Sequence, residues 1–376
     1  MNVTNRRRAL AASIALSVAA IYSVAPAVRA NDAYGDADNS VAFVQTNLDS
    51  NIAGRAQVTD PNLTNAWGLA FVPGSPFWVN ANHSGVATLY AGDGSIVPLV
   101  VTIPGPAGSQ TGFVAAPTGM IWNPSLDFAV PGSKFPAIFI FDTEDGTISA
   151  WNFNVDFTHA IIAVDNSQAG AVYKGLAFGT NVNGNNIYAT NFHAGTIDVF
   201  DSHFSPVQTD GKFVDHRIPG GFAPFGIQNI GGDLWVSYAK QDAAKHDDVG
   251  GAGSGFVDVF DTDGHLLRRF AEHGALNSPW GLARAPYGFG QFSGDILIGN
   301  FKDGKINAFD SHGNWRGNLR QPNGHSINID GLWGLAFGGA AKSSPEWLFF
   351  TAGPNGETDG LFGVINAVPR KGERDD

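Results

Sequence analysis

The chain has 376 residues, no cysteine and a formal net charge of −12 at pH 7. The absence of cysteine excludes disulfides, thiolate metal sites and cysteine nucleophiles. The acidic balance argues against nucleic acids and anionic membrane surfaces as partners, because both attract clusters of lysine and arginine. A chain of this length can bury a large core without covalent cross-links.

The first thirty residues predict a cleaved export signal. Arg6, Arg7 and Arg8 form a basic segment, residues 9–20 are an apolar run too short to span a bilayer, and residues 28–30 (Val-Arg-Ala) match a small-x-small cleavage site. A buried N-terminal helix is the alternative. The arginine run fits either a Sec or a twin-arginine route, since alanine stands where a twin-arginine signal usually has a bulky apolar residue.

Cleavage after residue 30 would leave a mature chain with 18 basic and 34 acidic residues, a net charge of about −16. No later apolar run reaches the length of a membrane span, so we expect no membrane insertion. The sequence thus predicts a soluble protein, expected to be a monomer, in the periplasm or outside the cell.

The strongest pattern after the signal is an apolar-flanked glycine that recurs six times at intervals of 51 to 56 residues. The repeated triplets are Trp67-Gly68-Leu69, Thr118-Gly119-Met120, Lys174-Gly175-Leu176, Phe225-Gly226-Ile227, Trp280-Gly281-Leu282 and Trp333-Gly334-Leu335. A steady period of this size is typical of propeller blades, with a superhelical solenoid as the structural alternative.

Each repeat unit continues with a second apolar run, a glycine-containing tip and an alternating run that ends in an Asp/Gly turn, as in residues 187–202. This order is typical of β-hairpins and predicts four short strands in each unit. We therefore predict an all-β, six-bladed β-propeller that forms a single domain over residues 31–376. Its blades are expected near residues 65–110, 116–165, 172–215, 223–271, 278–320 and 332–366.

Residues 41–48 (VAFVQTNL) predict a strand without a blade of its own, whereas the sixth unit ends after three strands. We expect this N-terminal strand to complete the sixth blade and to close the ring, because closure removes exposed strand edges.

The units VYKGLAFGTNVNGNNIYATNFHAGTIDVFD and SPWGLARAP resemble the repeats of NHL and SMP-30/gluconolactonase propellers. The mature chain is more similar to an uncharacterised family of exported bacterial propellers, above all in residues 238–261. The second resemblance implies a fold and an exported location but no activity.

The resemblance to SMP-30 propellers implies acidic and amide residues just before the glycines, where they bind a central divalent metal. Here those positions hold Trp67, Thr118, Lys174, Phe225, Trp280 and Trp333. None is a carboxylate or an amide, and oxygen ligands are what calcium and magnesium require. We therefore expect that this metal site is absent.

The same residues suggest an aromatic-lined mouth. Trp67, Phe225, Trp280 and Trp333 would form its walls, with Lys174 as the single charge, a composition suited to a flat apolar or sugar ligand. The alternative is that the rings plug the throat of the propeller as core.

A second set of polar residues lies two positions before tip glycines: His83, Glu144, His193 and Lys302. His83, Glu144 and His193 belong to consecutive blades, and histidine with carboxylate can bind a transition metal or transfer protons. Solvated hairpin tips are the alternative.

The unit for blade four carries a long insertion, AKQDAAKHDDVGGAGSG at residues 239–255. Lys240, Gln241 and Asp242 are candidates for ligand binding. His246, Asp247 and Asp248 are candidates for binding a divalent cation. The alternatives are a lid hinged on the glycines or a solvated loop. A polar loop at residues 353–360 is expected to approach the same mouth.

Two classes of function remain open. The first is a binding or scaffold protein whose ligand is a small molecule, a glycan or a protein held at the aromatic mouth. The second is a propeller-type hydrolase or lyase, with or without a divalent metal, that uses the blade-four loop. The sequence contains no G-x-S-x-G elbow, P-loop or dinucleotide fingerprint, and fold alone does not choose between the two classes.

Overall fold

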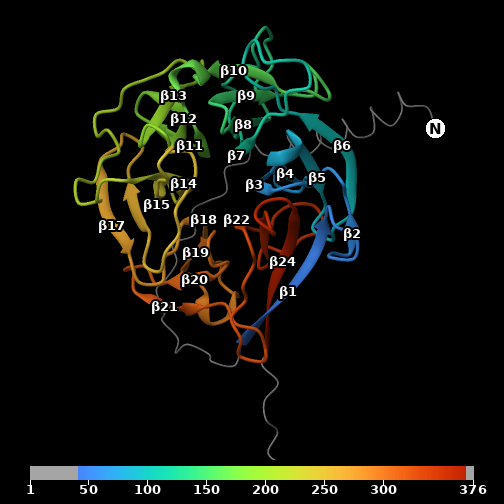
Figure 1. Cartoon of the computed structure of the whole chain (residues 1–376), viewed down its shortest axis with the longest axis vertical. Coiled ribbons are helices and arrows are strands. Elements are labelled where there is room, and N and C mark those ends of the chain that lie inside the picture. Colours follow the sequence, from blue (N-terminus) through green and yellow to red (C-terminus); the bar gives the residue numbers. More distant parts are fainter. Residues whose placement is uncertain (1–40, 370–376) are drawn as a thin grey trace, which may run out of the picture.

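The computed structural model describes residues 41–369, so the predicted export signal lies outside the described residues. Six sheets of mainly antiparallel strands stand around a central axis (Figure 1). The only helical segments in this part of the chain are three short 3₁₀ turns: η1 (Asn82–Ser84), η2 (Ser167–Ala169) and η3 (Gly290–Phe292). The all-β six-bladed propeller predicted from the glycine repeat is confirmed. No helix of the described residues is long and apolar enough to cross a membrane.

The first three blades follow one another along the chain, each with its first strand next to the axis (Figure 1). Blade one contains β3 (Ala66–Phe71), β4 (Phe77–Ala81), β5 (Val86–Tyr90) and β6 (Ile96–Thr102). Blade two contains β7 (Pro117–Trp122), β8 (Phe139–Thr143), β9 (Thr147–Trp151) and β10 (Ile161–Asp165). Blade three contains β11 (Tyr173–Asn181), β12 (Gly184–Asn191) and β13 (Thr196–Asp201).

The other three blades repeat the arrangement. Blade four contains β14 (Phe222–Ile230), β15 (Asp233–Lys240), β16 (Phe256–Phe260) and β17 (Leu266–Glu272). Blade five contains β18 (Pro279–Arg284), β19 (Ile296–Asn300), β20 (Ile306–Phe309) and β21 (Trp315–Asn318). Blade six contains β22 (Leu332–Phe337), β23 (Leu348–Ala352), β24 (Leu361–Pro369) and β1 (Val41–Ser50), with the short β2 (Val58–Thr59) parallel to β1.

Blade three has three regular strands, whereas four were predicted in each unit. Its outer segment pairs with β13 through the bond from Val207 N to Val199 O, at 2.9 Å, and through an isolated bridge between Phe200 and Pro206. Pro206 has no N–H to donate to a ladder, which explains why a regular fourth strand does not form there.

The N-terminal strand lies in the last blade. β1 pairs antiparallel with β24 from Val41 opposite Pro369 to Ser50 opposite Leu361, with a bulge between Asn47 and Asp49. The first described strand is thus paired with the last one in the same blade.

The repeated glycine lets the first strands of neighbouring blades approach closely. Each first strand shifts register where the glycine stands, as between Ala66 and Leu69 in β3. A Cβ on Gly68 would lie 2.3 Å from Thr118 O of blade two, and a Cβ on Gly226 would lie 2.1 Å from Trp280 O of blade five. Only glycine leaves room for the next backbone at these positions.

Antiparallel pairing decides which parts of the blades share one end of the ring. The start of each first strand and the turn between the second and third strands lie together, because the second strand runs back alongside the first. We call this end the tip face. The turns between the first and second strands lie at the other end, which we call the base face.

Candidate functional site

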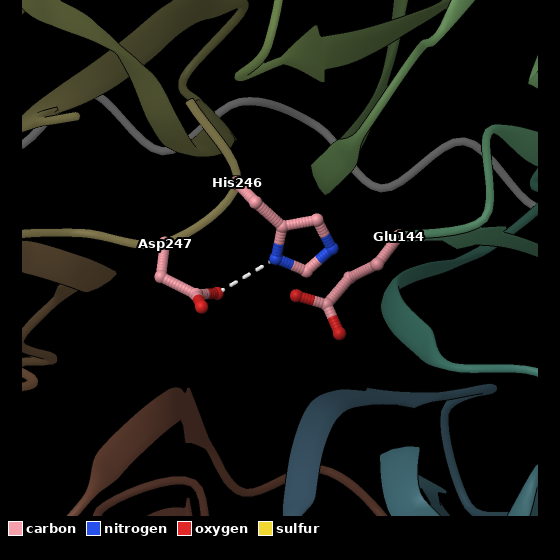
Figure 2. Close-up of side chains that lie close together, drawn as sticks. All are labelled: Glu144, His246 and Asp247. Carbon is pink, nitrogen blue, oxygen red and sulfur yellow. Dashed lines mark hydrogen bonds and ion pairs between the residues drawn. The ribbon is translucent and has the colours of Figure 1, made fainter. Parts of the chain in front are cut away.

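The tip face carries a cluster formed by Glu144, His246 and Asp247 (Figure 2). Glu144 lies in the turn between β8 and β9, and the other two lie in the loop between β15 and β16. Each residue offers one ligand atom, and these atoms all lie within 4.8 Å of one another. His246 Nδ1 lies 2.9 Å from Asp247 Oδ1. The cluster therefore joins blade two to blade four.

Lys174, at the start of β11 in blade three, supplies a buried positive charge to this cluster. Its side chain is 2% exposed; its ammonium is bonded to Glu144 and lies 3.6 Å from Asp247 Oδ1. The same nitrogen lies over the rings of Trp67 and Phe192, 5.2 and 5.8 Å from their centroids. Two carboxylates and two aromatic faces thus surround the ammonium, and both kinds of group stabilise a cation.

Neighbouring charges set the protonation of the cluster. Burial disfavours the charged form of Lys174, but the ion pair with Glu144 outweighs burial and raises the pKa of Lys174. The hydrogen bond with Asp247 raises the pKa of His246, and the same bond lowers the pKa of Asp247 to about 2. Lys174 and Asp247 are therefore charged at neutral pH.

Two asparagines connect the cluster to blades one and six. Asn82 Nδ2 donates to Glu144 Oε2 at 3.0 Å, and Asn65 Nδ2 donates to Glu357 Oε1 at 3.0 Å. Asn65 Nδ2 also lies 3.3 Å from Asn82 Oδ1. Burial and then the charge of Glu144 raise the pKa of Glu357. One polar network therefore contains side chains from five of the six blades.

Acidic side chains outnumber basic ones in and beside this network. Burial raises the pKa of Asp145, whose carboxylate accepts the Ala116 N–H at 2.7 Å and whose charged neighbours include Glu144 and His246. Four carboxylates, those of Glu144, Asp145, Asp247 and Glu357, thus accompany one ammonium and one imidazole. This excess of acids favours a cation as the ligand of the site.

The blade-four loop is folded back by its own hydrogen bonds. Asp242 Oδ1 accepts the backbone N–H of His246 at 2.9 Å, and the backbone N–H of Asp242 donates to Asp247 O at 2.8 Å. Gln241 Nε2 donates to Phe192 O at 2.5 Å, which ties the base of the loop to blade three. Gln241 and Asp242 thus position the loop that carries the cluster.

Asp248 belongs to the same loop but contacts a different blade. Its buried carboxylate lies 3.3 Å from Lys302 Nζ of blade five, and burial raises the pKa of Asp248. A Cβ on Gly250 would lie 2.5 Å from Lys302 Cγ, so glycine at this position permits the approach. Of the three consecutive residues predicted to bind metal, only His246 and Asp247 enter the cluster.

The aromatic residues before the glycines pack against one another. Trp67 and Trp333 stack with ring centroids 3.6 Å apart, and Trp280 meets both edge-on at 6.4 and 5.9 Å. Trp67, Trp333 and Phe225 are at most 1% exposed. The rings fill the throat next to the cluster, which is the packed alternative to an open aromatic mouth.

The central metal implied by the resemblance to SMP-30 propellers does not fit this throat. The stacked indoles of Trp67 and Trp333 stand at the positions that would carry oxygen ligands. The nearby amide oxygen of Asn65 accepts the indole N–H of Trp333 at 3.1 Å, so it is already engaged.

The remaining predicted residues lie apart from the cluster. His83 and His193 are exposed, and neither belongs to the group of close ligand atoms. Lys240 is exposed at the end of β15. The structure therefore assembles Glu144 with His246 and Asp247, but not with the histidines of the neighbouring tips.

Sequence reasoning missed Asn65 and Asn82 and placed Glu357 only within a polar loop. Asn65 stands two residues before Trp67, and Asn82 follows β4 directly; both are at most 1% exposed. Their positions in the sequence could have indicated them, because each asparagine lies directly beside a predicted strand, at the end that belongs to the tip face.

No protein-family model matches the chain. It is 33% identical over 327 residues to uncharacterized protein R648 of Acanthamoeba polyphaga mimivirus, covering 85% of this chain and 78% of the relative. It is 32% identical over 315 residues to uncharacterized protein L690 of the same virus, covering 81% of each chain. These relatives are viral, so they do not support the bacterial source expected above, and export stays a prediction.

Among solved structures, a gluconolactonase from Xanthomonas campestris superposes with a TM-score of 0.50 at 14% identity. The match covers 92% of this chain and 96% of that one. At this identity the likeness concerns the fold, and it agrees with the distant similarity to gluconolactonase-type propellers expected from the repeats.

Proposed function

The chain belongs to the family that contains the mimivirus proteins R648 and L690, and we propose that this member is a ligand-binding propeller that holds a divalent cation at Glu144, His246 and Asp247. The observation that carries the proposal is the convergence of these three side chains, from two blades, to within 4.8 Å of one another. Ligands of one metal ion lie about 2.0–2.2 Å from it, so small side-chain movements would bring this set into a coordination shell.

The donor set indicates which cations to test. One imidazole and two carboxylates suit manganese, iron or zinc better than calcium, which prefers oxygen ligands alone. The excess of carboxylates in the network supports the proposal, because a bound cation would offset their mutual repulsion.

Lys174 gives this site an unusual property. Its ammonium already lies between Glu144 and Asp247, so it occupies the place where a metal charge would be most favourable. We therefore expect the ion to compete with Lys174 for these carboxylates, and the affinity to be moderate. An organic anion would then bind to the metal and to the displaced ammonium together.

Isothermal titration of the metal-free protein with manganese or zinc chloride tests the proposal. We expect one ion per chain, and loss of binding in His246→Ala and Asp247→Asn. His83→Ala is the matched control, because His83 is an exposed histidine of a neighbouring tip, and it should bind as the parent does. The proposal is wrong if the parent binds no ion or if all three variants bind equally well.

A second candidate function uses the same residues as an acid–base centre. The imidazole of His246 is hydrogen-bonded through Nδ1 to Asp247, which leaves Nε2 as the atom that could accept a proton. The Lys174 ammonium nearby could stabilise a developing oxyanion. The similarity to a gluconolactonase fold suggests a sugar lactone as the first substrate to try. Lactone turnover that disappears in the His246→Ala variant, but persists when a metal chelator is added to the parent protein, would favour this candidate over the metal-binding one.

We also propose that the protein is exported by way of the basic and apolar segments of residues 1–30. Expression of the full chain in a bacterium, followed by N-terminal sequencing of the product, tests this. A mature product that begins at Asn31 outside the cytoplasm is expected, and an uncleaved cytoplasmic product would contradict the proposal.

A further inference from the structure

A cavity lined by the described residues opens at the base face, away from the Glu144 cluster. Its volume is ≈ 670 Å³, within the range of pockets that hold small molecules. The first strands of all six blades line it beyond their repeated glycines, together with Pro124 and Gly231 from base-face turns. The cavity thus occupies the part of the central channel that the aromatic plug leaves free.

The lining follows the blade repeat. The residue directly after the glycine forms an apolar belt in five blades: Leu69, Met120, Leu176, Leu282 and Leu335. The corresponding Ile227 of blade four lines a smaller adjoining pocket. The residue two positions further on forms a second belt nearer the opening: Phe71, Trp122, Phe178, Asn229, Arg284 and Phe337. Five blades therefore give either an aromatic ring or a charge to the outer belt, and the inner belt is apolar throughout.

The polar groups of the cavity gather on blades four and five. Arg284 is the one charged residue in the lining and, within the part of the chain that the structure describes, takes part in no ion pair. Gln228 is exposed to the cavity, and its amide makes no hydrogen bond with the described residues. Asn229 is already engaged, because its amide donates to Phe178 O at 2.9 Å.

Exposed apolar side chains stand in three of the turns at this face. Leu126, Val182 and Tyr287 are 71%, 94% and 95% exposed, and no other large apolar side chains of the described residues are more exposed. They lie in the first turns of blades two, three and five. Exposed apolar groups on one face of a protein are typical of a surface that meets apolar ligands or partners.

We propose that this cavity binds a small amphiphilic carboxylate, with its hydrocarbon portion against the two belts and its carboxylate on Arg284, assisted by the amide of Gln228. An arginine binds a carboxylate through two parallel N–H donors. The site lies at the opposite end of the channel from the proposed metal site, so either proposal stands without the other.

Isothermal titration of the full-length protein with three ten-carbon probes tests the inference: decanoate, 1-decanol and decyltrimethylammonium, each below its micelle concentration. We expect decanoate to bind about tenfold more tightly than decanol, which is the effect of one charge-assisted hydrogen-bond pair. The cationic probe should bind most weakly of the three.

Two variants separate the head group from the tail. Arg284→Gln should reduce affinity for decanoate to that for decanol and leave decanol binding unchanged. Ala336→Phe, at a half-buried lining position, should weaken both. Lys134→Gln, at an exposed cation outside the lining, should bind decanoate as the parent does. The inference is overturned if the parent binds no decanoate, if the cationic probe binds as well, or if Arg284→Gln keeps the preference for decanoate.

Discussion

Lys174 and Glu144 form an ion pair across the boundary between blades three and two, and the lysine side chain is 2% exposed. Both charges lose water in the folded state, so each depends on the other for its stability. The pair lies beside the loop of blade four, which contributes Asp247. This relationship makes the proposed metal site part of the packing between blades.

We expect Lys174→Met to destabilise the protein by about 3–5 kcal/mol, the usual effect of removing one partner of a buried ion pair. Glu144→Gln in the same chain should restore most of that loss, because no unpaired charge then remains. Urea denaturation of the parent, both single variants and the double variant measures the coupling. Equal losses in the single and double variants would mean that the pair contributes only through packing.

Removal of Lys174 should also change the affinity of the proposed site for a divalent cation. If Lys174 competes with a metal, a folded Lys174→Met variant should bind manganese at least tenfold more tightly than the parent, since a charge interaction of about 1.4 kcal/mol corresponds to tenfold. A titration compares the two proteins at the same pH and salt concentration. Weaker metal binding in a variant that is still folded would show that Lys174 assists the ion and does not oppose it.

Stability should depend on pH through Asp49 of the closing strand. Burial, followed by the charges of Asp60 and Asp93, raises the pKa of Asp49 to about 8, and neither of its carboxylate oxygens has a hydrogen-bond partner among the described residues. The folded protein therefore holds a proton there that the unfolded chain releases near pH 4. The contribution of Asp49 to the free energy of unfolding is fully present below pH 4 and is lost as the pH rises to about 8.

Asp49→Asn tests this dependence, because the amide has the shape of the protonated acid and no charge. The variant should be more stable than the parent at pH 8 and should lose part of the decline in melting temperature between pH 5 and pH 8. Asp210→Asn is the control, since that carboxylate is exposed and is not among the charges that raise the pKa of Asp49. A variant with the same decline as the parent would contradict the buried proton.

The aromatic plug should be a large contributor to stability. Trp333 is 1% exposed and stacks on Trp67 and Phe301, with ring centroids 3.6 and 3.9 Å away. Trp333→Ala should cost about 3–5 kcal/mol by chemical denaturation, as expected for a large buried ring. Tyr287→Ala, at a 95% exposed position, should change stability by about 0.5 kcal/mol or less. A small effect of Trp333→Ala would favour an open mouth over a plug.

The closing strand can be tested by truncation. A chain that lacks residues 1–50 loses β1 and its pairing with β24, so it should melt at a much lower temperature and expose an edge that promotes aggregation. A chain that lacks residues 1–30 retains β1 and serves as the control. Similar melting temperatures for the two chains would contradict the role of β1 in closure.

The fold could be predicted from the sequence because its period is local and repeated. Each triplet such as Trp67-Gly68-Leu69 marks the same register shift in a first strand, and the runs that follow it are hairpins. The missing fourth strand of blade three was not predicted, although Pro206 in the sequence favours an irregular edge.

The site was only partly predictable, because its contacts join distant segments. Glu144 and His246 were both candidates, but their pairing depends on how far the blade-four loop reaches across blade three. Asp248 was a candidate for the same site as Asp247, yet it faces Lys302, because the loop bends at Asp247 before Asp248 pairs with Gln241. The base-face cavity was not predicted, because the apolar residues that follow each glycine have the composition of a buried core.

The glycine contacts between first strands limit which substitutions and insertions the sequence can accept during evolution. In blade six, a Cβ on Gly334 would lie 2.9 Å from Trp67 O of blade one, so the series of close approaches returns to its start. In a linear array, a bulkier side chain at one junction could push the units beyond it outward. A closed ring of blades has no free end that could move to accommodate such a displacement. Each of the six glycines therefore constrains the spacing of every blade, and insertions are accommodated most easily in turns at the two faces, as in the tip-face loop of blade four.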